Sequence, residues 1–540
     1  MKLITRFLYL PAACIVLLAS CAKEQTESYD KFEDQALEAY MTQKHPELLE
    51  NLQAEGGYYV DVLEPGLADA KPVNDTICWV KFDFSGRDLN GNIALTRRAG
   101  EAKQLNTFTK YTHYVPYYRY CGTANSGLME GTYLAMRNTL YLGEDYIKLK
   151  KEQDGFDLEP EFLLREGAKV RIYMPSRVVG SGGVSGDGGY EGQYSLSAKR
   201  PLIMEMEVVG IDKNPLAAEG SLVDAFAKEN GGMVMYTKDG EDGTEKRPTD
   251  PEDEKHPYNR DDVRWVSACD TVAQLYVNVK YNPAKTDKGD QFTFNFTDAE
   301  NKVDNKAYNV GYEPYNMDDM SALEVKIAKA LKDRFHGKDD DYKAYEGVDK
   351  LESDSVGLDG TAKIWYIGRF LDGFIFDTNI DEVKEIIYGA GNYTEGSAKS
   401  YKPEDGGDLT AWYYTVPNLR YGQWAAFVTT STNAYGTNGR SGSSSSSGNG
   451  NGYSSSYYDY LNYLNYSQGY YGNSGYYGGY YGDYYGYGGL GGYGYGYGYY
   501  GNYGYDYGST DDTSTTTTVT TEIPSFAPLV YQFYIEPAED

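Results

Sequence analysis

The order of apolar and polar residues along the chain predicts one early helix followed mainly by strands. Lys31 to Ala54 has apolar positions at helical spacing, and Gly56 and Gly57 follow as a stop signal. Strand-like stretches take over from Tyr58. The expected strands are 77–84 (closed by a turn at Asn90–Gly91), 170–174, 202–211, 273–281, 363–366, 424–430 and 529–535, and a further helix is expected at 321–335.

The middle of the chain carries a charged segment between two globular regions. Residues 237–262 are rich in charge and punctuated by Pro and Gly, which is typical of an exposed loop or a linker. Together with the residues before it, we assign 213–262 to an acidic linker. The globular regions on either side are then 58–212 and 263–540.

The second globular region contains a low-complexity insertion at 437–521, between its last two strands. The chain has 62 Gly and 58 Tyr, and much of this excess lies between Ser441 and Ser509. Such a composition lacks aliphatic residues, so we expect the tract to be disordered or loosely ordered. Two interpretations stay open. Its tyrosines contact peptides, glycans or each other, or it is a tolerated surface-loop expansion, since closure entropy grows only logarithmically with length.

The N-terminus predicts secretion. Lys2 and Arg6 precede an apolar run that ends at Ala19, a pattern typical of a signal peptide over 1–20 and too short to span a bilayer. The run ends in Leu-Ala-Ser-Cys21, which resembles the bacterial lipobox. That resemblance implies lipidation of Cys21, with a tether and helix at 21–57. The alternative is a plain cleaved signal with an incidental cysteine.

Charge and cysteine content exclude several classes of function. Lys+Arg is 50 and Asp+Glu is 80, a net charge of −30, which excludes nucleic-acid binding and binding of anionic lipid through a basic face. The remaining cysteines, Cys78, Cys121 and Cys269, are odd in number and lack CxxC spacing, so they leave room for one bridge at most. The four histidines are scattered, so we expect no metal and no cofactor.

Three separated motifs suggest a family. Residues 365–378 contain Y-x-G, a hairpin with Asp-Gly, and then F-D. Trp412 is followed, without a gap in the spacing, by Ala-Tyr435-Gly. Residues 523–531 read IPSFAPLVY, against I-P-P-x-x-x-L-V-F in the family. Together and in this order, the motifs resemble FKBP-type peptidyl-prolyl isomerases.

The resemblance implies an α+β fold with two FKBP-like domains, each a twisted antiparallel sheet around a short helix. It also implies a pocket floored by Trp412. The implied catalytic residues are Tyr366, Phe376, Asp377, Trp412 and Tyr435, and the implied substrate-binding residues are Leu409, Ile523 and Tyr531. The alternative is that these aromatic side chains are ordinary core residues.

The first globular region has the same motifs in the same order, but the site residues are replaced. Ala94 and Leu95 replace the Phe-Asp pair, Thr132 stands where the Trp is expected, and 178–180 replaces Ala-Tyr-Gly. We therefore expect little or no isomerase activity there, and a role in binding, spacing or dimerisation.

The expected function is isomerisation of Xaa–Pro bonds in envelope or secreted proteins. The partners are proline-containing polypeptides, and contact with the membrane is through the lipid anchor only, without nucleic acid. The expected location is the envelope of a Gram-negative bacterium, in the outer membrane on its periplasmic or surface face. The alternative is a non-enzymatic binding or adhesive lipoprotein that reuses FKBP-like frames.

Overall fold

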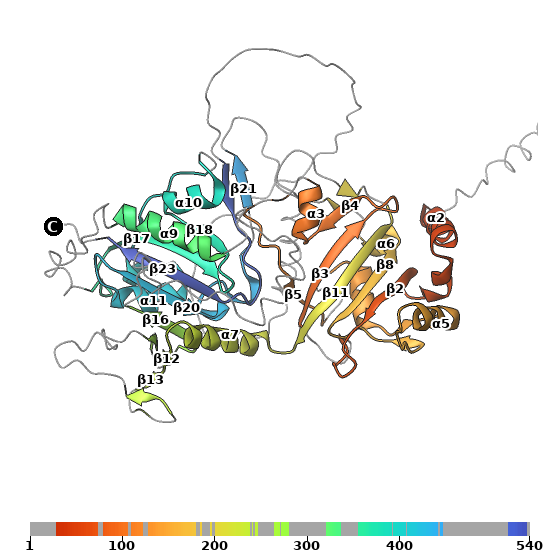
Figure 1. Cartoon of the computed structure of the whole chain (residues 1–540), viewed down its shortest axis with the longest axis horizontal. Coiled ribbons are helices and arrows are strands. Elements are labelled where there is room, and N and C mark those ends of the chain that lie inside the picture. Colours follow the sequence, from red (N-terminus) through yellow and green to blue (C-terminus); the bar gives the residue numbers. More distant parts are fainter. Residues whose placement is uncertain are drawn as a thin grey trace, which may run out of the picture.

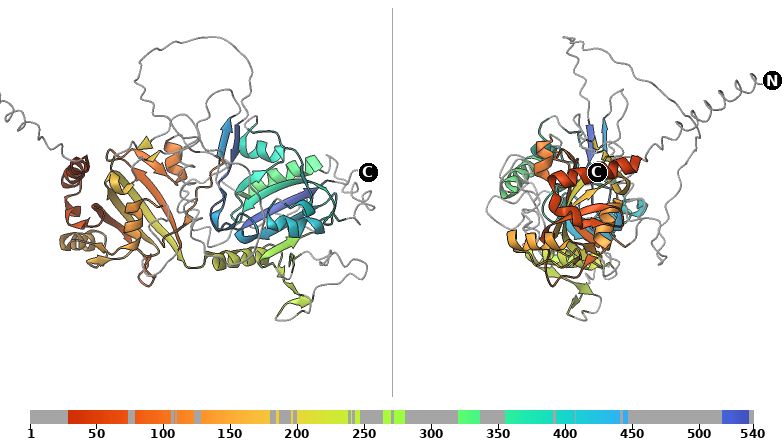
Figure 2. Two further views of the ribbon diagram at one scale, coloured as in Figure 1. Left: turned by 180° about the vertical axis from the view of Figure 1, so that it is seen from behind. Right: turned by 90° about the vertical axis from the view of Figure 1, so that its right-hand side faces the viewer.

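The computed structural model describes residues 29–536 with gaps, the longest at 247–263, 280–319, 336–354 and 447–516. The expected signal peptide at 1–20, the lipidation site Cys21 and most of the low-complexity tract therefore lie outside the described residues. Figures 1 and 2 show two sheets side by side, each with helices packed against it. The mixture of helices and mainly antiparallel sheets agrees with the expected α+β class.

The first sheet has the strand order β1-β2-β8-β11-β3-β4, with β5 also paired to β3. Its pairings are all antiparallel. The bounds are β1 (Leu52–Gln53), β2 (Tyr58–Pro65), β3 (Trp79–Arg87), β4 (Ile93–Thr96), β5 (Tyr117–Tyr120), β8 (Ala168–Met174) and β11 (Leu202–Asp212). The strands expected at 170–174 and 202–211 are confirmed, and the Asn90–Gly91 turn is closed by Asp88, whose Oδ1 accepts the Asn90 and Asn92 amides.

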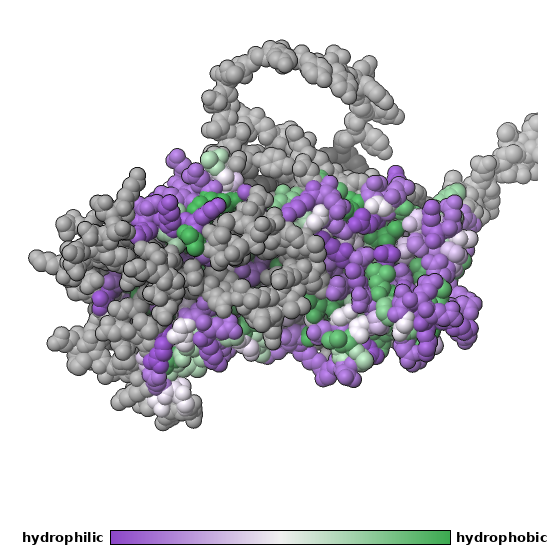
Figure 3. All heavy atoms as spheres, in the orientation of Figure 1, coloured by the Kyte–Doolittle hydropathy of each residue, from purple (hydrophilic) through white to green (hydrophobic). Residues whose placement is uncertain are grey.

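The two faces of β11 differ as its sequence predicts. Met204 and Met206 are buried in the core, whereas Glu205 lies between them on the other face. There Glu205 accepts hydrogen bonds from Arg98 at 2.8 Å and from Arg171 at 3.0 Å. Figure 3 shows hydrophilic residues dominating much of this part of the described surface, with hydrophobic residues between them.

The N-terminal helix is shorter than expected. Helix α2 spans Tyr29–Lys44, a 3-10 turn follows at Pro46–Asn51, and β1 then pairs with the start of β2. The expectation of one helix from Lys31 to Ala54 was wrong because Pro46 disfavours helical backbone in the residue before it and lacks the amide proton that would continue the helix.

Shorter helices pack around the first sheet. They are α3 (Ala99–Gln104), α4 (Glu130–Arg137), α5 (Glu144–Gln153) and α6 (Ser176–Val179). Small two-stranded pairs link β6 (Leu140–Tyr141) to β7 (Glu161–Phe162) and β9 (Val184–Ser185) to β10 (Ser195–Leu196). Helix α4 buries Thr132, Leu134, Ala135 and Met136 in the core. This helix carries Thr132, the residue that stands where the motif would have a Trp.

The second sheet has the order β12-β15-β16-β20-β23-β17-β18, with β19 also paired to β17. Its pairs are antiparallel except β12 with β15. The bounds are β12 (Met233–Val234), β15 (Trp265–Ser267), β16 (Leu275–Asn278), β17 (Ala362–Phe370), β18 (Ile375–Thr378), β19 (Lys399–Tyr401), β20 (Trp424–Thr429) and β23 (Leu529–Ile535). The strand expected at 529–535 is confirmed at both ends.

The two sheets repeat one pattern. The order β2-β8-β11-β3-β4 in the first corresponds to β16-β20-β23-β17-β18 in the second, and each has an extra strand on the long hairpin strand. The hairpins share their register, because Gly86 lies opposite Leu95 and Gly368 lies opposite Asp377, each beside a register shift. The two sheets therefore share one order of strand pairing.

The segment assigned to an acidic linker contains a packed helix. Helix α7 spans Pro215–Glu229, and its Val223, Phe226 and Ala227 are buried against Trp265 and other residues of the second sheet. Val223, Phe226 and Ala227 follow helical spacing, and Pro215 occupies the first turn, where its missing amide proton costs nothing. The charge of the following residues masked this signal. Short strands β13 (Tyr236–Thr237) and β14 (Glu245–Lys246) follow the helix.

Strand β23 has all seven of its residues buried, and its two faces pack against different helices. On one face, Tyr531 and Phe533 contact Trp412 of α11 (Thr410–Thr415). On the other, Tyr534 contacts Phe335 of α9 (Met320–Phe335), with ring centroids 4.4 Å apart. Helix α9 confirms the helix expected at 321–335, and α10 (Asp381–Tyr388) packs beside it.

The low-complexity tract begins and ends in a paired ladder. β21 (Ser443–Ser446) pairs antiparallel with β22 (Thr517–Thr520), from Ser443 opposite Thr520 to Ser446 opposite Thr517. Beneath it, Arg440 and Ile523 exchange both backbone hydrogen bonds, each 2.7 Å long. The described ends of 437–521 are thus ordered next to β23.

Within the described part of the chain, no helix is long and apolar enough to cross a bilayer. The described cysteines, Cys121 and Cys269, form no disulfide with each other. No group of three or more His, Cys, Asp or Glu side chains with metal-binding geometry was found among the described residues.

A buried ion pair joins α9 to β17 and gives a test of the fold. The Arg369 side chain is fully buried and binds both carboxylate oxygens of Glu324, at 2.5 and 3.2 Å. Glu324→Ala leaves a buried guanidinium without its counter-charge, so we expect it to lower the free energy of unfolding by about 3–5 kcal/mol. Urea denaturation measures this loss.

Glu382→Ala is the matched control. Glu382 pairs with Arg334, but its side chain is 40% exposed, so its loss should cost about 1 kcal/mol or less. Equal losses in the two variants would contradict the importance assigned to the buried pair.

Candidate functional site

Trp412 is the centre of an aromatic cluster on the second sheet. Its side chain is only 3% exposed, and its ring meets Tyr366, Tyr531 and Phe533 edge-on at centroid distances of 5.7, 5.8 and 4.7 Å. Edge-to-face contacts of this kind add to the free energy gained by burial. The Trp412 Nε1 has no hydrogen-bond partner among the described residues.

The Y-x-G motif has a steric cause. A Cβ atom at Gly368 would lie 2.7 Å from Phe376 Cζ and 3.1 Å from Tyr531 Cε1. Only glycine therefore lets the Phe376 and Tyr531 rings meet over β17, where their centroids are 5.6 Å apart. The motif residue predicted from the sequence brings two predicted site residues together.

Asp377 and Tyr366 form the polar edge of the cluster. The Tyr366 hydroxyl donates to Asp377 Oδ2 at 3.2 Å, and the Asp377 side chain is 37% exposed. Burial and the nearby Asp377 charge raise the pKa of Tyr366, so its hydroxyl keeps its proton and remains a donor. This hydrogen bond holds the carboxylate at the border between solvent and the rings.

Tyr435 brings a second hydroxyl to the same edge. It follows the 3-10 turn Ser431–Asn433, is half-buried, and lies with its oxygen 3.3 Å from the Tyr531 oxygen. Burial raises the pKa of the fully enclosed Tyr531 well above its usual range. Tyr531 departs from the phenylalanine expected at that position of the motif, and its extra hydroxyl is used in this contact.

The remaining predicted residues border the cluster. Leu409 lies at the N-terminus of α11, half-buried against the same core, and Ile523 is buried in it. The structure therefore brings all eight predicted residues to one place, with Trp412, Phe376, Ile523 and Tyr531 buried and Tyr366, Asp377, Leu409 and Tyr435 partly exposed.

Arg440 lies at the same edge and was not predicted from the sequence. Its guanidinium donates to the Tyr435 hydroxyl oxygen at 3.3 Å and lies 3.7 Å from Asp377. It also lies over the Phe376 and Tyr435 rings, 5.8 and 5.1 Å from their centroids. Arg440 sits at the start of a Gly/Ser-rich run, so only its backbone pairing with Ile523 reveals its position.

A second cation lies against the cluster. Lys399 Nζ lies 5.1 Å from the centroid of the Trp412 ring, and it pairs with Asp408 at 2.5 Å. The Lys399 charge is therefore balanced by a carboxylate.

Residues near the first sheet contact the segments that flank the cluster. Glu522, next to Ile523, is buried between Arg97 at 3.4 Å and Arg119 at 3.9 Å. His113 stacks on Phe370 with centroids 4.5 Å apart, and it contacts Asp372 at 2.6 Å. These contacts join residues more than 250 positions apart, so no local pattern predicts them.

The first region's equivalent site is aliphatic. Leu95 occupies the register position of Asp377, and Leu95 Cδ2 lies 2.8 Å from where a Cβ of Gly86 would be. Thr132 is buried in α4, and its hydroxyl has no hydrogen-bond partner among the described residues. The substitutions expected from the sequence thus leave neither an indole floor nor a carboxylate edge there.

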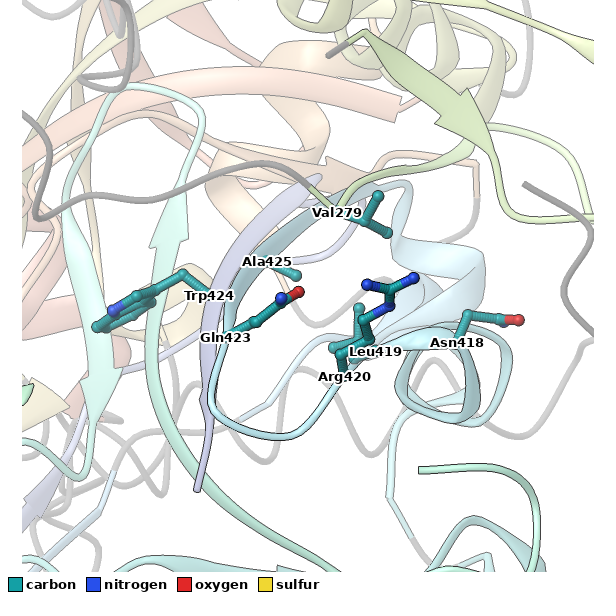
Figure 4. A pocket seen from close by; sticks show the side chains of 7 residues that line it. All are labelled: Val279, Asn418, Leu419, Arg420, Gln423, Trp424 and Ala425. Carbon is teal, nitrogen blue, oxygen red and sulfur yellow. The ribbon is translucent and has the colours of Figure 1, made fainter. Parts of the chain in front are cut away.

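A small hollow elsewhere on the second sheet is shown in Figure 4. It is lined by Val279, Asn418, Leu419, Arg420, Gln423, Trp424 and Ala425. None of the predicted site residues lines it, and its residues carry no arrangement with an evident chemistry.

Comparison with protein-family models finds no match, and neither does comparison with curated proteins. Among solved structures, the chain is similar to a peptidyl-prolyl cis-trans isomerase from Pseudomonas syringae pv. tomato (17% identity, 34% of this chain, 96% of that chain, TM-score 0.20). It is also similar to FkpA from Escherichia coli (12% identity, 39% of this chain, 72% of that chain, TM-score 0.20). A further similar structure is that of the three FKBP domains of wheat FKBP73 (8% identity, 90% of this chain, 97% of that chain, TM-score 0.18). At these identities and TM-scores, the likeness carries no argument about this chain.

The loop that carries Tyr435 depends on a buried carboxylate. Glu219 of α7 accepts hydrogen bonds from the Ser431 amide and, at 2.8 Å, from the Ser431 hydroxyl. Burial raises the pKa of Glu219 to about 7, and the Ser431 hydrogen bonds oppose the shift. The folded state thus keeps a proton that the unfolded state releases near its ordinary pKa, so this group's contribution to stability falls as pH rises from about 4.5 to 7.

We predict that Glu219→Gln reduces the loss of stability between pH 5 and pH 8, because glutamine does not titrate. Urea denaturation of both proteins at the two pH values measures the difference. Glu229→Gln, an exposed carboxylate on the same helix, is the control and should behave as the wild type. An unchanged pH dependence in Glu219→Gln would exclude this origin.

Proposed function

We propose that the chain is an FKBP-type peptidyl-prolyl isomerase that acts on Xaa–Pro bonds of envelope or secreted proteins. The observation that carries this proposal is the cluster around Trp412, where eight residues from separate motifs form a buried aromatic floor with a partly exposed Tyr–Asp edge. A lipid on Cys21 would hold the protein in the envelope of a Gram-negative bacterium, on the side where such clients fold.

The chemistry requires no nucleophile, metal or cofactor. Rotation about the Xaa–Pro bond is slow because amide resonance opposes it, with a barrier of about 18–20 kcal/mol. The twisted amide is less dipolar than the planar one, so a dry apolar surface favours it relative to water. The partly exposed rings of Tyr366 and Tyr435, packed against the buried rings of Trp412, Phe376 and Tyr531, would supply that surface for a proline ring.

The polar edge would position the peptide. The Tyr435 oxygen can accept from Arg440 and from Tyr531, which leaves its own proton free to donate to a substrate carbonyl. Asp377 accepts from Tyr366 and orients the edge rather than acting as a base. No proton has to leave the substrate in this mechanism.

The first region would keep the frame without the activity. Its Leu95, Ala94 and Thr132 take the positions of the Asp377, Phe376 and Trp412 side chains, so it lacks both floor and edge. We infer that it supports the second region, since Arg97 and Arg119 bury Glu522 beside the cluster.

A second candidate function is peptide binding without turnover. The position of Arg440 over the Phe376 and Tyr435 rings favours it, because a fixed side chain there would restrict rotation of a bound prolyl bond. Binding of proline peptides without acceleration of isomerisation would support this candidate.

The decisive variant is Trp412→Leu in the full chain. It removes the indole floor, so we expect kcat/KM for an Xaa–Pro tetrapeptide in a protease-coupled assay to fall about tenfold or more. Trp424→Leu is the matched control, since Trp424 of β20 is buried to the same extent but makes no ring contact with Trp412. No acceleration by the wild-type protein on any Xaa–Pro peptide would reject the enzymatic function.

A further inference from the structure

The contacts of Arg440 suggest which peptides the site accepts. Its backbone is held by the pairing with Ile523, and its Nη2 donates to the Thr521 carbonyl at 3.1 Å. Its side chain is 25% exposed, so the guanidinium borders solvent while it lies against the rings. The cation is therefore placed by the chain itself at the partly exposed edge of the cluster.

We propose that Arg440 makes the site prefer prolyl bonds that follow an acidic residue. This inference rests on the proposed isomerase function and names the substrate class of the same site. It concerns the residue directly before proline, whose carbonyl belongs to the rotating bond.

The distances support this assignment. If the Tyr435 hydroxyl holds the carbonyl of the rotating bond, the Cα of the preceding residue lies one bond beyond that carbonyl carbon. The Arg440 Nη1 lies 3.3 Å from the same hydroxyl oxygen. A glutamate side chain extends about 4 Å from its Cα, which follows from ordinary bond lengths, so its carboxylate can reach the guanidinium without moving the proline ring.

Arg440 has donors left for such a carboxylate. A guanidinium has five N–H donors, and the hydrogen bonds described above use one to Tyr435 and one to Thr521. Arg440 Nε is buried, so the donors that a substrate can reach are the remaining N–H groups of Nη1 and Nη2. Planar guanidinium groups bind carboxylates well because two parallel N–H bonds can form.

The neighbouring carboxylate only partly balances this charge. Asp377 is 3.7 Å from Arg440 Nη1, too far for a hydrogen bond, and it already accepts from Tyr366. Lys399 is instead paired closely with Asp408. Arg440 is thus the cation at this edge best placed to meet a substrate, within the part of the chain that the structure describes.

The test compares two peptides that differ by one charge. Succinyl-Ala-Glu-Pro-Phe and succinyl-Ala-Gln-Pro-Phe anilides are assayed with the full chain, and the ratio of their kcat/KM values is the readout. We expect the wild-type ratio to favour glutamate by about fivefold, the size of one partly exposed ion pair. Arg440→Gln should bring the ratio to one or below, and Arg440→Lys should retain part of it.

Lys402→Gln is the control, because it removes one positive charge from a partly exposed position outside the cluster. It should leave the ratio unchanged. The inference is overturned if the wild type does not distinguish the peptides, or if its preference survives Arg440→Gln. Absence of turnover with both peptides would instead reject the isomerase function, and the inference with it.

Discussion

Burial of β23 on both faces is the constraint on which the second half of the structure depends. The strand pairs with β17 on one side and β20 on the other, so its side chains must fill the space on both faces of the sheet. On one face Tyr531 and Phe533 contact Trp412, and on the other Gln532 accepts from Arg369 beside Glu324. The site and the ion pair are therefore opposite faces of one strand, and β23 must be in register for both.

Residues 521–526, just before β23, contact side chains from the first half of the chain. Glu522 is buried with Arg97 and Arg119, and Phe526 meets Trp79 edge-on at 4.6 Å. A buried carboxylate is costly unless cations offset its loss of hydration. Residues 521–526 thus adopt their position only when the first half of the chain supplies those cations. This gives the first half a physical role at the candidate site, although its own site residues are absent.

Sequence patterns predicted those elements and motif residues whose structure depends on their neighbours in the sequence. Local alternation predicted the strand at 529–535, and helical spacing predicted the helix that ends at Phe335. The motif predicted the glycine at position 368, over which the Phe376 and Tyr531 rings meet. Two errors were also local: Pro46 ends the first helix, and the charge after α7 hid its apolar face. Arg440 and His113 could not be predicted, because Arg440 pairs with Ile523 and His113 contacts Asp372, both far away in sequence. Their surroundings also carry no periodic signal.

The ladder between β21 and β22 has a consequence for how this chain can vary. Four residue pairs join the two ends of the glycine- and tyrosine-rich stretch. The pairing of Arg440 with Ile523 lies just outside this ladder, on the side of the cluster. Gain or loss of repeat units between Ser446 and Thr517 changes neither these pairs nor the residues beneath them. The length of the stretch can therefore change while the ladder still closes the same loop beside the cluster around Trp412.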